Sequence, residues 1–370
     1  MKKDWQIKKL GEVCNIIGGT TPSTTNKSYW NGTEKWITPA EIDINKKYIF
    51  DSVRHITTQA VKDCSLQLQP KGTVIFTSRA PIGKVAISEM DFYCNQGFKN
   101  FVCSEEIFNE YLYYFLLKNV DYLNSIGKGT TFKEISKTVI SQVQIPLPPL
   151  EEQKRIVAVL DKKFAQIETL KTAAEKNLQN TKQLFQAELE KAFSNTSWET
   201  QLFSDLFKLT SGEYLNSKSI IKGQYPIYGG NGIIAYHNEY NLTGDNIIIG
   251  RVGALCGNVR FLSEPIWLTD NAFKLSFLKD PFDYKFLTYL LNFKDLRKYA
   301  RQAAQPVISN SSLKDIEIPL PPLEEQKRIV AHLDSLSEKV HQLEEIYTKQ
   351  LADCDELKQS LLQKAFEGEL

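Results

Sequence analysis

The stretch IPLPPLEEQKRIVA occurs twice in this chain, at residues 145–158 and again at residues 318–331. Fourteen consecutive identities at an offset of 173 residues cannot reasonably arise by chance, so the chain is an internal repeat. The same offset relates residues 184–193 (LFQAELEKAF) to residues 357–366 (LKQSLLQKAF). The chain therefore alternates a globular part, a long segment, a second globular part and a second long segment.

Each motif leads into a segment that predicts one long helix, over residues 151–193 and 324–370. Proline pairs stand just before both segments, where the missing N–H of proline costs no helical hydrogen bond. Glutamates follow in the first turn, where they complement the helix dipole. A helix of 43 residues would be about 64 Å long, far beyond the usual 8–20 residues of a globular core helix.

Apolar residues at alternating spacings of four and three predict a coiled-coil seam on both helices. The seam is regular in the second helix and less so in the first, where Lys163, Asn177 and Thr181 fall on it. Two equal helices in one chain most simply pair with each other, antiparallel, and pairing with another chain is the alternative. The predicted seam residues are Ile156, Leu160, Ile167, Leu170 and Leu184 in the first helix, and Ile329, Leu333, Leu336, Val340, Leu343, Leu357 and Leu361 in the second.

The globular parts, residues 1–150 and 194–323, repeat more faintly and read as mixed α and β structure. Short β-branched runs at 73–76 and 247–249 predict strands, and the aromatic-rich segment 110–117 predicts a short buried helix. Residues 73–85 resemble 246–259, which aligns Arg79 with Arg251. Residues 95–99 resemble 270–274 in the same way.

Composition and charge exclude several classes of protein. The 370 residues include 45 basic and 44 acidic side chains, for a net charge of +1. By segment, residues 1–150 carry +4 and residues 324–370 carry −5, so this is no uniformly basic nucleic-acid coat. No apolar run could span a bilayer, and no apolar segment follows Met1 as in a secretory signal. The six scattered cysteines are expected to be reduced thiols of a cytoplasmic protein.

Motifs for catalysis are missing from the sequence. Residues 127–131 (GKGTT) have the wrong order for a P-loop, and no nucleophile elbow or H-E-x-x-H motif occurs. Two of the four histidines lie on the long helices, where a solvated face is expected. A binding module is therefore favoured over an enzyme, with no catalytic, cofactor or metal residues assigned.

Both globular parts carry side chains that suit base edges and phosphates. Arginine suits guanine and amides suit adenine, whereas lysines and hydroxyls suit phosphates. For any one of them, a solvated surface role is the alternative. The candidate DNA-binding residues are Thr20, Thr21, Lys27, Tyr29, Arg79, Asn95, Gln96, Lys128, Thr130 and Thr131 in the first part, and Tyr228, Asn231, Arg251, Asn271, Arg301 and Gln305 in the second.

The whole pattern resembles the specificity subunit of type I restriction–modification systems, chiefly through the two copies of IPLPPLEEQ. The resemblance implies an α+β fold with two mixed α/β target recognition domains, at 1–150 and 194–323. It implies that the helices at 151–193 and 324–370 form an antiparallel coiled coil within a pseudo-twofold tandem repeat. Because the two parts differ in sequence, we expect an asymmetric, bipartite double-stranded DNA target, with one half-site for each domain.

The resemblance also implies partners and assigns the chemistry to them. Methyltransferase (modification) subunits, two in number, would dock on the coiled coil, and restriction or translocase subunits could join. S-adenosylmethionine, ATP and magnesium would serve those partners, so no cofactor and no membrane are expected for this chain. Two alternatives stay open: a methyltransferase or nuclease with degenerate motifs, and a coiled-coil scaffold that binds only protein.

Overall fold

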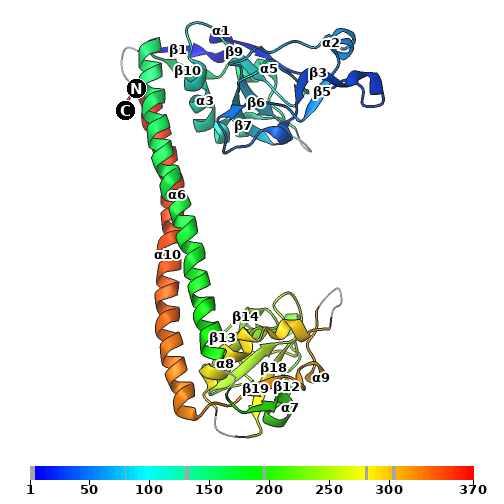
Figure 1. The fold of residues 1–370 in the computed structure, drawn as a ribbon, viewed down its shortest axis with the longest axis vertical. Coiled ribbons are helices and arrows are strands. Elements are labelled where there is room, and N and C mark those ends of the chain that lie inside the picture. Colours follow the sequence, from blue (N-terminus) through cyan, green and yellow to red (C-terminus); the bar gives the residue numbers. More distant parts are fainter. Residues whose placement is uncertain (1–4, 80, 130–132, 195–196, 280–281, 302–305) are drawn as a thin grey trace. The chain divides into compact units, whose positions relative to one another are not determined.

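The structure is a computed structural model that describes residues 5–79, 81–129, 133–194, 197–279, 282–301 and 306–370. The chain forms two compact units (Figure 1). Unit 1 comprises Met1–Ala174 and Lys349–Leu370, and unit 2 comprises Glu175–Thr348. Both long helices therefore contribute one end to each unit.

The described part of unit 1 contains a sheet of order β2-β9-β6-β7-β4, a sheet of order β5-β3-β8 and the pair β1-β10. Every residue of β6 is buried, as expected for a central strand covered on both faces. The strand predicted at 73–76 is confirmed. The strands are β1 (Gln6–Lys9), β2 (Cys14–Ile17), β3 (Trp30–Ile37), β4 (Tyr48–Ile49), β5 (Arg54–Ile56), β6 (Val74–Ser78), β7 (Ile82–Ser88), β8 (Tyr93–Cys94), β9 (Asn100–Cys103) and β10 (Gln144–Leu147).

Helix α3 joins the large sheet of unit 1 to the long helices α6 (Leu150–Phe193) and α10 (Leu323–Glu367). Its ring of Tyr111 lies 4.9 Å from that of Phe366 near the end of α10. The buried helix predicted at 110–117 is confirmed. The helices of unit 1 are α1 (Leu10–Val13), η1 (Lys27–Tyr29), η2 (Pro39–Glu41), α2 (Thr58–Asp63), α3 (Asn109–Lys118), α4 (Val120–Ile126) and α5 (Lys137–Ser141).

Unit 2 repeats these sheets, with a sheet of order β12-β18-β15-β16, a sheet of order β14-β13-β17 and the pair β11-β19. The strand predicted at 247–249 is confirmed as the centre of β15. The strands are β11 (Thr200–Leu202), β12 (Phe207–Ser211), β13 (Tyr225–Gly229), β14 (Gly232–His237), β15 (Asn246–Gly250), β16 (Val259–Leu262), β17 (Trp267–Leu268), β18 (Ala272–Phe277) and β19 (Glu317–Pro319).

Helix α8 occupies in unit 2 the place of α3. Its Phe286 packs on Phe193 of α6 with ring centres 5.6 Å apart, so the LxxxxxxKAF ending of each long helix closes one apolar core. The helices of unit 2 are α7 (Phe203–Leu206), η3 (Ser217–Ser219), α8 (Tyr284–Phe293), η4 (Leu296–Tyr299) and α9 (Asn310–Leu313).

The two predicted long helices are present as α6 and α10, starting one residue earlier than expected. A buried glutamine near the start of each fastens it to its unit. The amide of Gln153 accepts from Phe108 N (2.8 Å) and donates to two carbonyl oxygens. Gln326 likewise accepts from Asp283 N (2.9 Å) and donates to Pro321 O.

Ion pairs between α6 and α10 show that the helices run antiparallel in unit 1. Glu168 pairs with Lys358 (2.9 Å) and Lys171 with Asp355 (3.0 Å), so numbers rise on one helix as they fall on the other. In unit 2, Glu188 of α6 contacts His332 of α10 at 2.9 Å. Six of the predicted seam residues are buried and Leu336 and Leu361 are half-buried; the buried six are Ile156, Leu160, Ile167, Ile329, Leu333 and Val340.

Four predicted seam residues lie outside the seam. Leu170, Leu184, Leu343 and Leu357 are 60%, 50%, 37% and 47% exposed. The predicted heptad phase is therefore wrong at every second seam position. At each of these positions, the residue that follows the predicted one faces the partner helix. These inner residues include Lys171, Leu178 and Phe185 on α6, and Ser337, Glu344, Leu351 and Lys358 on α10, none of them fully exposed.

Three further observations concern the described residues as a whole. The six cysteines are free thiols. No group of three or more metal-ligating side chains occurs in the described ranges. None of the helices there is both long and apolar enough to cross a membrane.

Candidate nucleic-acid interface

In unit 1, four candidate residues meet where the loop after β2 lies against the turn after β8. Thr20 N donates to Cys94 O (2.9 Å), and Thr21 Oγ1 donates to Gln96 Oε1 (2.5 Å). Asn95 Oδ1 accepts from Gly97 N and so shapes the turn. The structure therefore brings Thr20, Thr21, Asn95 and Gln96 together.

Glycine is required at the centre of this contact. A Cβ on Gly19 would lie 2.1 Å from Cys94 O, a distance that no side chain tolerates. In unit 2 the same approach occurs at Gly212, whose Cβ would lie 2.3 Å from Leu268 O. The loop that carries the candidate residues Thr20 and Thr21 is thus held by backbone packing.

Arg79 and Lys128 continue the same surface. The turn that carries Gln96 is bonded to β6 through Ser78 N and Gly97 O (2.8 Å), and Arg79 follows Ser78 directly. Arg79 and Lys128 each form an antiparallel bridge with Glu134. The Arg79 guanidinium is 3.9 Å from the Glu134 carboxylate.

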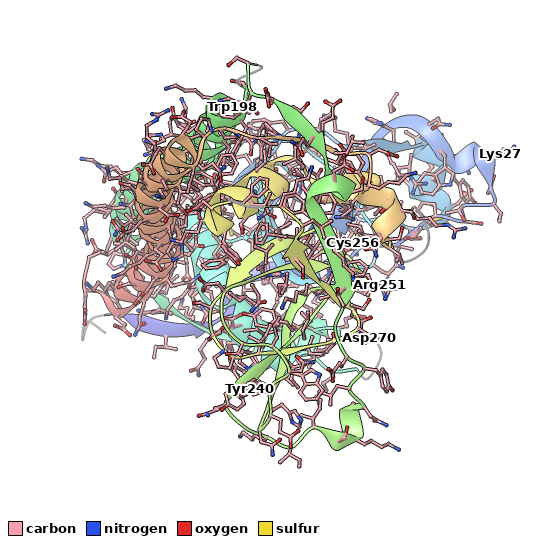
Figure 2. The ribbon with its side chains drawn as sticks, turned by 90° about the horizontal axis from the view of Figure 1, so that it is seen from below. Lys27, Trp198, Tyr240, Arg251, Cys256 and Asp270 are labelled. Carbon is pink, nitrogen blue, oxygen red and sulfur yellow. The ribbon has the colours of Figure 1, made fainter. Side chains whose placement is uncertain are left out.

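Lys27 and Tyr29 are placed elsewhere in unit 1, on η1. Figure 2 labels Lys27 on a projecting loop, where its side chain is exposed. The Tyr29 hydroxyl donates to Asp63 on α2 (3.1 Å), and this hydrogen bond raises the pKa of Tyr29. Beside them, the Arg54 guanidinium stacks on Trp30 at 4.0 Å from the ring centre. This aromatic and cationic group was not among the predicted residues.

Three candidate residues, Thr130, Thr131 and Gln305, lie outside the described residues.

In unit 2, Arg251 is held by its neighbours (Figure 2). Its NH1 donates to Ser211 Oγ and Asp270 O, both at 3.3 Å, and its guanidinium lies 5.3 Å from the ring centre of Phe273. Its Nε is buried without a hydrogen-bond partner among the described groups. Arg251 is therefore partly covered, with its orientation set by the turn around Asp270.

The other described candidates of unit 2 differ in exposure. Asn231 is exposed and accepts from Leu255 N (3.0 Å), and Asn271 and Arg301 are exposed as well. Tyr228 is only 6% exposed and packs with Ile248 and Leu268. Its ring supports the sheet of β13, where all residues from Pro226 to Gly229 are buried, so its prediction as a surface residue that contacts DNA was wrong.

Backbone hydrogen bonds fix how the two units correspond. Ile135 N donates to Ser78 O (3.0 Å), and Ile308 N donates to Arg251 O (2.9 Å). Arg251 thus stands at the position of Ser78, and the alignment of Arg79 with Arg251 is wrong by one residue. Short repeated runs such as IIIG and VIFT fit equally well in neighbouring registers, which is why the sequence misled here.

The alignment of residues 95–99 with 270–274 is wrong by one residue as well. Ser78 N donates to Gly97 O, and Arg251 N donates to Asn271 O, so Gly97 and Asn271 correspond. It follows that Phe273 stands at the position of Lys99. In unit 1 the cation is Lys99, just before β9, and it donates to Ser78. In unit 2 the cation is Arg251, just after β15, and it lies over the ring of Phe273.

Two functional candidates escaped the sequence reading. Lys99 is only 14% exposed at its side chain and donates to Ser78 Oγ (3.3 Å) and to Glu134 Oε1 (3.1 Å). The run NQGFK could have suggested Lys99. Nothing in the sequence links Glu134 to Arg79, because only the backbone register brings them together.

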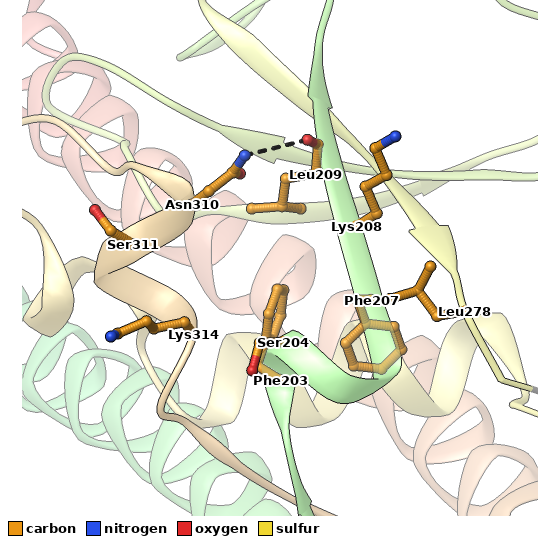
Figure 3. A pocket seen from close by; sticks show the side chains of 9 residues that line it. All are labelled: Phe203, Ser204, Phe207, Lys208, Leu209, Leu278, Asn310, Ser311 and Lys314. Carbon is orange, nitrogen blue, oxygen red and sulfur yellow. Dashed lines mark hydrogen bonds between the residues drawn. The ribbon is translucent and has the colours of Figure 1, made fainter.

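Unit 2 contains a pocket of about 410 Å³, lined by polar and apolar side chains (Figure 3). It opens beside the start of β12, where Asn310 Nδ2 donates to Leu209 O (3.4 Å). Ser204 and Ser311 supply hydroxyls, and Lys208 and Lys314 supply amines, around phenylalanine and leucine side chains. The lining residues include no carboxylate and no imidazole to activate a hydroxyl.

Most of the chain matches one known protein family. Residues 2–179 and 195–351 match the model of the type I restriction modification DNA specificity domain. The chain is 40% identical over 239 residues to the type I restriction enzyme MjaIX specificity subunit of Methanocaldococcus jannaschii, covering 59% of this chain and 55% of that one. It is 26% identical over 359 residues to the EcoprrI specificity subunit of Escherichia coli, covering 91% and 88%.

Solved structures show the same fold. A structure described under complex assembly and conformational transition of the type I R-M system aligns with a TM-score of 0.83 at 22% identity, covering 100% of this chain and 99% of that one. The HsdS subunit of Thermoanaerobacter tengcongensis aligns with a TM-score of 0.64, also at 22% identity, covering 100% and 98%. Two mixed α/β domains with two long antiparallel helices are therefore the architecture of this chain.

Proposed function

Because the chain belongs to the type I restriction modification DNA specificity family, we propose that it is the DNA sequence-specificity subunit of a restriction–modification complex. One observation carries the proposal. The order β2-β9-β6-β7 of unit 1 recurs as β12-β18-β15-β16 in unit 2, with the same hydrogen-bond frame, but β4 is added in unit 1 and the side chains at corresponding loop positions differ. Such a pair of scaffolds suits the reading of two unlike half-sites.

The proposed division of the chain follows from the repeat. Residues 1–150 and 194–323 are target recognition domains, each for one half of a bipartite double-stranded DNA target. Residues 151–193 and 324–370 are the spacer helices. In the first domain, Gln96 suits a base edge, whereas Thr21, Arg79 and Lys128 suit phosphates. In the second, the exposed Asn271 suits a base edge and the exposed Arg301 suits a phosphate.

The helix pair is the proposed docking surface for two modification subunits. In heptad terms, Leu170 and Leu357 are both g positions, which face each other along one flank of an antiparallel pair. Leu184 and Leu343 occupy the same positions in unit 2. All four leucines are exposed, and a docked subunit would remove this apolar surface from water.

The reactions belong to the partners in this proposal. S-adenosylmethionine would bind to the modification subunits, and ATP and magnesium would serve any restriction subunits. This chain would bind and orient DNA in the cytoplasm without forming or breaking covalent bonds.

Methylation-aware sequencing tests the proposal directly. DNA from cells that express the chain with its modification subunit should carry methyl groups at one asymmetric target, made of two half-sites and an unread spacer. A palindromic or continuous target would contradict the two-domain reading. Purified chain given labelled S-adenosylmethionine and DNA should transfer no label until the modification subunit is added, and transfer by the chain alone would contradict the non-catalytic role.

Matched substitutions sharpen the same experiment. Gln96→Ala in unit 1 should relax the base preference of one half-site only, and Asn271→Ala in unit 2 that of the other only, because each exposed amide suits a base edge. Lys298→Ala is a fitting control, because that lysine pairs with Asp295 within one turn of η4. If either substitution relaxed both half-sites equally, the assignment of one half-site to each unit would be wrong.

A further inference from the structure

Three side chains form a row on the described surface of unit 1. Arg79, Glu134 and Lys128 lie on adjacent segments, with Glu134 bridged to both neighbours. Glu134 and Lys128 exchange two backbone hydrogen bonds of 2.9 and 3.0 Å. Directly opposite residues of an antiparallel pair project from the same face, so the three side chains share one face with the carboxylate in the middle.

Unit 2 has the same row with different side chains. Arg301 and Val307 exchange backbone hydrogen bonds of 2.9 and 3.4 Å, and Val307 is bridged to Val252. The row therefore reads Val252, Val307, Arg301 where unit 1 reads Arg79, Glu134, Lys128. The cation at the end of the row is retained, but the central position changes from a carboxylate to an apolar side chain.

Glu134 forms ion pairs with two cations of unit 1. Its carboxylate lies 3.1 Å from the Lys99 ammonium and 3.9 Å from the Arg79 guanidinium. The side chain of Lys99 is 14% exposed and that of Glu134 is 41% exposed, so the carboxylate is the more accessible member of that pair. A phosphate that approached these cations would compete with the carboxylate for them.

We propose that Glu134 limits the affinity of the first recognition domain for DNA, acting as an internal counter-ion that DNA phosphate must displace from Lys99 and Arg79. This proposal depends on the proposed function, because it takes DNA as the ligand of unit 1. Its consequence is that unit 1 binds any duplex less tightly than its cations alone would allow. Unit 2, with Val307, has no carboxylate at the corresponding position.

Two reciprocal substitutions in the full chain test this proposal. Glu134→Gln removes the negative charge and keeps the side chain's size, whereas Val307→Glu introduces a carboxylate at the matching position of unit 2. The control is Glu106→Gln, which removes a carboxylate paired with Lys8 at 2.6 Å elsewhere in unit 1. Circular dichroism checks that each variant is folded.

The affinity of each variant is measured over a range of salt concentrations for two kinds of duplex DNA. One has mixed sequence, and the other carries the target sequence that methylation-aware sequencing identifies. Glu134→Gln should tighten binding to both about fivefold, the effect of removing one like charge about 4 Å from a phosphate in water. The slope of log affinity against log salt should become steeper by about 0.9, as for one more phosphate contact. Val307→Glu should weaken both, and Glu106→Gln should change neither.

The outcomes separate this proposal from the proposed function. The counter-ion role is wrong if Glu134→Gln leaves binding unchanged. It is also wrong if Glu134→Gln weakens binding to the target alone, as the loss of a base contact would. In both cases target recognition by the chain still stands. If the unsubstituted chain prefers no target but Glu134→Gln still tightens mixed-sequence binding, the proposed function is wrong and the counter-ion role stands. Absence of all DNA binding would overturn both.

Discussion

The hydroxyl of Tyr289 on α8 donates a 2.9 Å hydrogen bond to the carboxylate of Asp334 on α10. The same pair recurs in unit 1, where Tyr114 of α3 donates to Asp161 of α6. Lysines join both pairs, because Lys285 lies 2.6 Å from Asp334 and Lys47 lies 2.8 Å from Asp161. Each globular domain is thereby fastened to a long helix by a tyrosine, an aspartate and a lysine.

Removing the tyrosine hydroxyl should loosen this attachment. Tyr289→Phe should lower the free energy of unfolding by about 1 kcal/mol, since the lost hydrogen bond ends on a charged but partly solvated carboxylate. Tyr114→Phe should cost at least as much, because Tyr114 is 3% exposed. Urea unfolding measures both. Tyr122→Phe, at a 53% exposed position, is the control, and equal stability of all three variants would contradict the role of the pair.

The buried glutamines at the starts of the long helices should matter more. Gln153 is 0% exposed and satisfies Phe108 N and the carbonyl oxygens of Glu106 and Pro148. Gln153→Ala leaves those groups buried without partners, which should cost about 2–4 kcal/mol. Gln363→Ala, on an exposed face of α10, should be neutral in the same thermal or urea unfolding. A cost below that of Tyr289→Phe would show that water replaces the amide.

The exposed leucines of the helix pair should govern assembly without governing stability. Leu170→Lys or Leu357→Lys should weaken association with the modification subunit about tenfold, as for a central apolar anchor, and the unit 2 counterparts Leu184→Lys and Leu343→Lys should do the same. Stability should stay within about 0.5 kcal/mol, as for surface positions. Sedimentation or calorimetric titration measures binding.

The control for assembly is Thr172→Lys, at an exposed position two residues beyond Leu170 and so about 200° round α6 from it. It adds the same charge to the helix away from the leucine flank, so association should be unchanged. Equal weakening by Thr172→Lys and Leu170→Lys would show that charge alone, and not the apolar flank, governs docking.

Alkaline pH should unfold the chain through its tyrosines. Burial raises the pKa of Tyr113 to about 12, and burial together with the hydrogen bond to Asp334 raises that of Tyr289 to about 12. Above pH 10 the unfolded chain loses protons that the folded chain keeps, so the stability present at lower pH falls as the pH rises from about 10 to 12. Tyrosinate absorbance and circular dichroism should change together in that range. Complete tyrosine ionisation near pH 10 with an unchanged dichroism signal would contradict the burial effect.

Element identity was predictable where a pattern is local and long. Proline pairs, first-turn glutamates and 43 uninterrupted residues located α6 and α10 to within a few residues. The heptad phase was not predictable, because Leu170 and Leu184 offered a more apolar seam than the true one. Lys171 and Lys358 face the partner helix instead, where ion pairs with Asp355 and Glu168 keep their charged ends satisfied.

The candidate interface was predictable only in part, because contacts between residues far apart in the sequence define it. Thr21 and Gln96 were both identified from the sequence, but their hydrogen bond joins loops 75 residues apart. Arg79 and Arg251 were identified as cations, yet their equivalence failed because strand register depends on backbone pairing, which single residues do not reveal. Glu134 escaped because its meaning comes only from the cations beside it.

The composition of unit 1 has a consequence for the timing of folding. Its core takes Leu362, Ala365 and Phe366 from the end of α10, together with residues made more than two hundred positions earlier. Unit 2 is one continuous stretch, Glu175–Thr348. On the ribosome the domain synthesised first is therefore completed last, and a nonsense codon shortly before Leu362 damages the N-terminal domain while it spares the one in the middle of the chain.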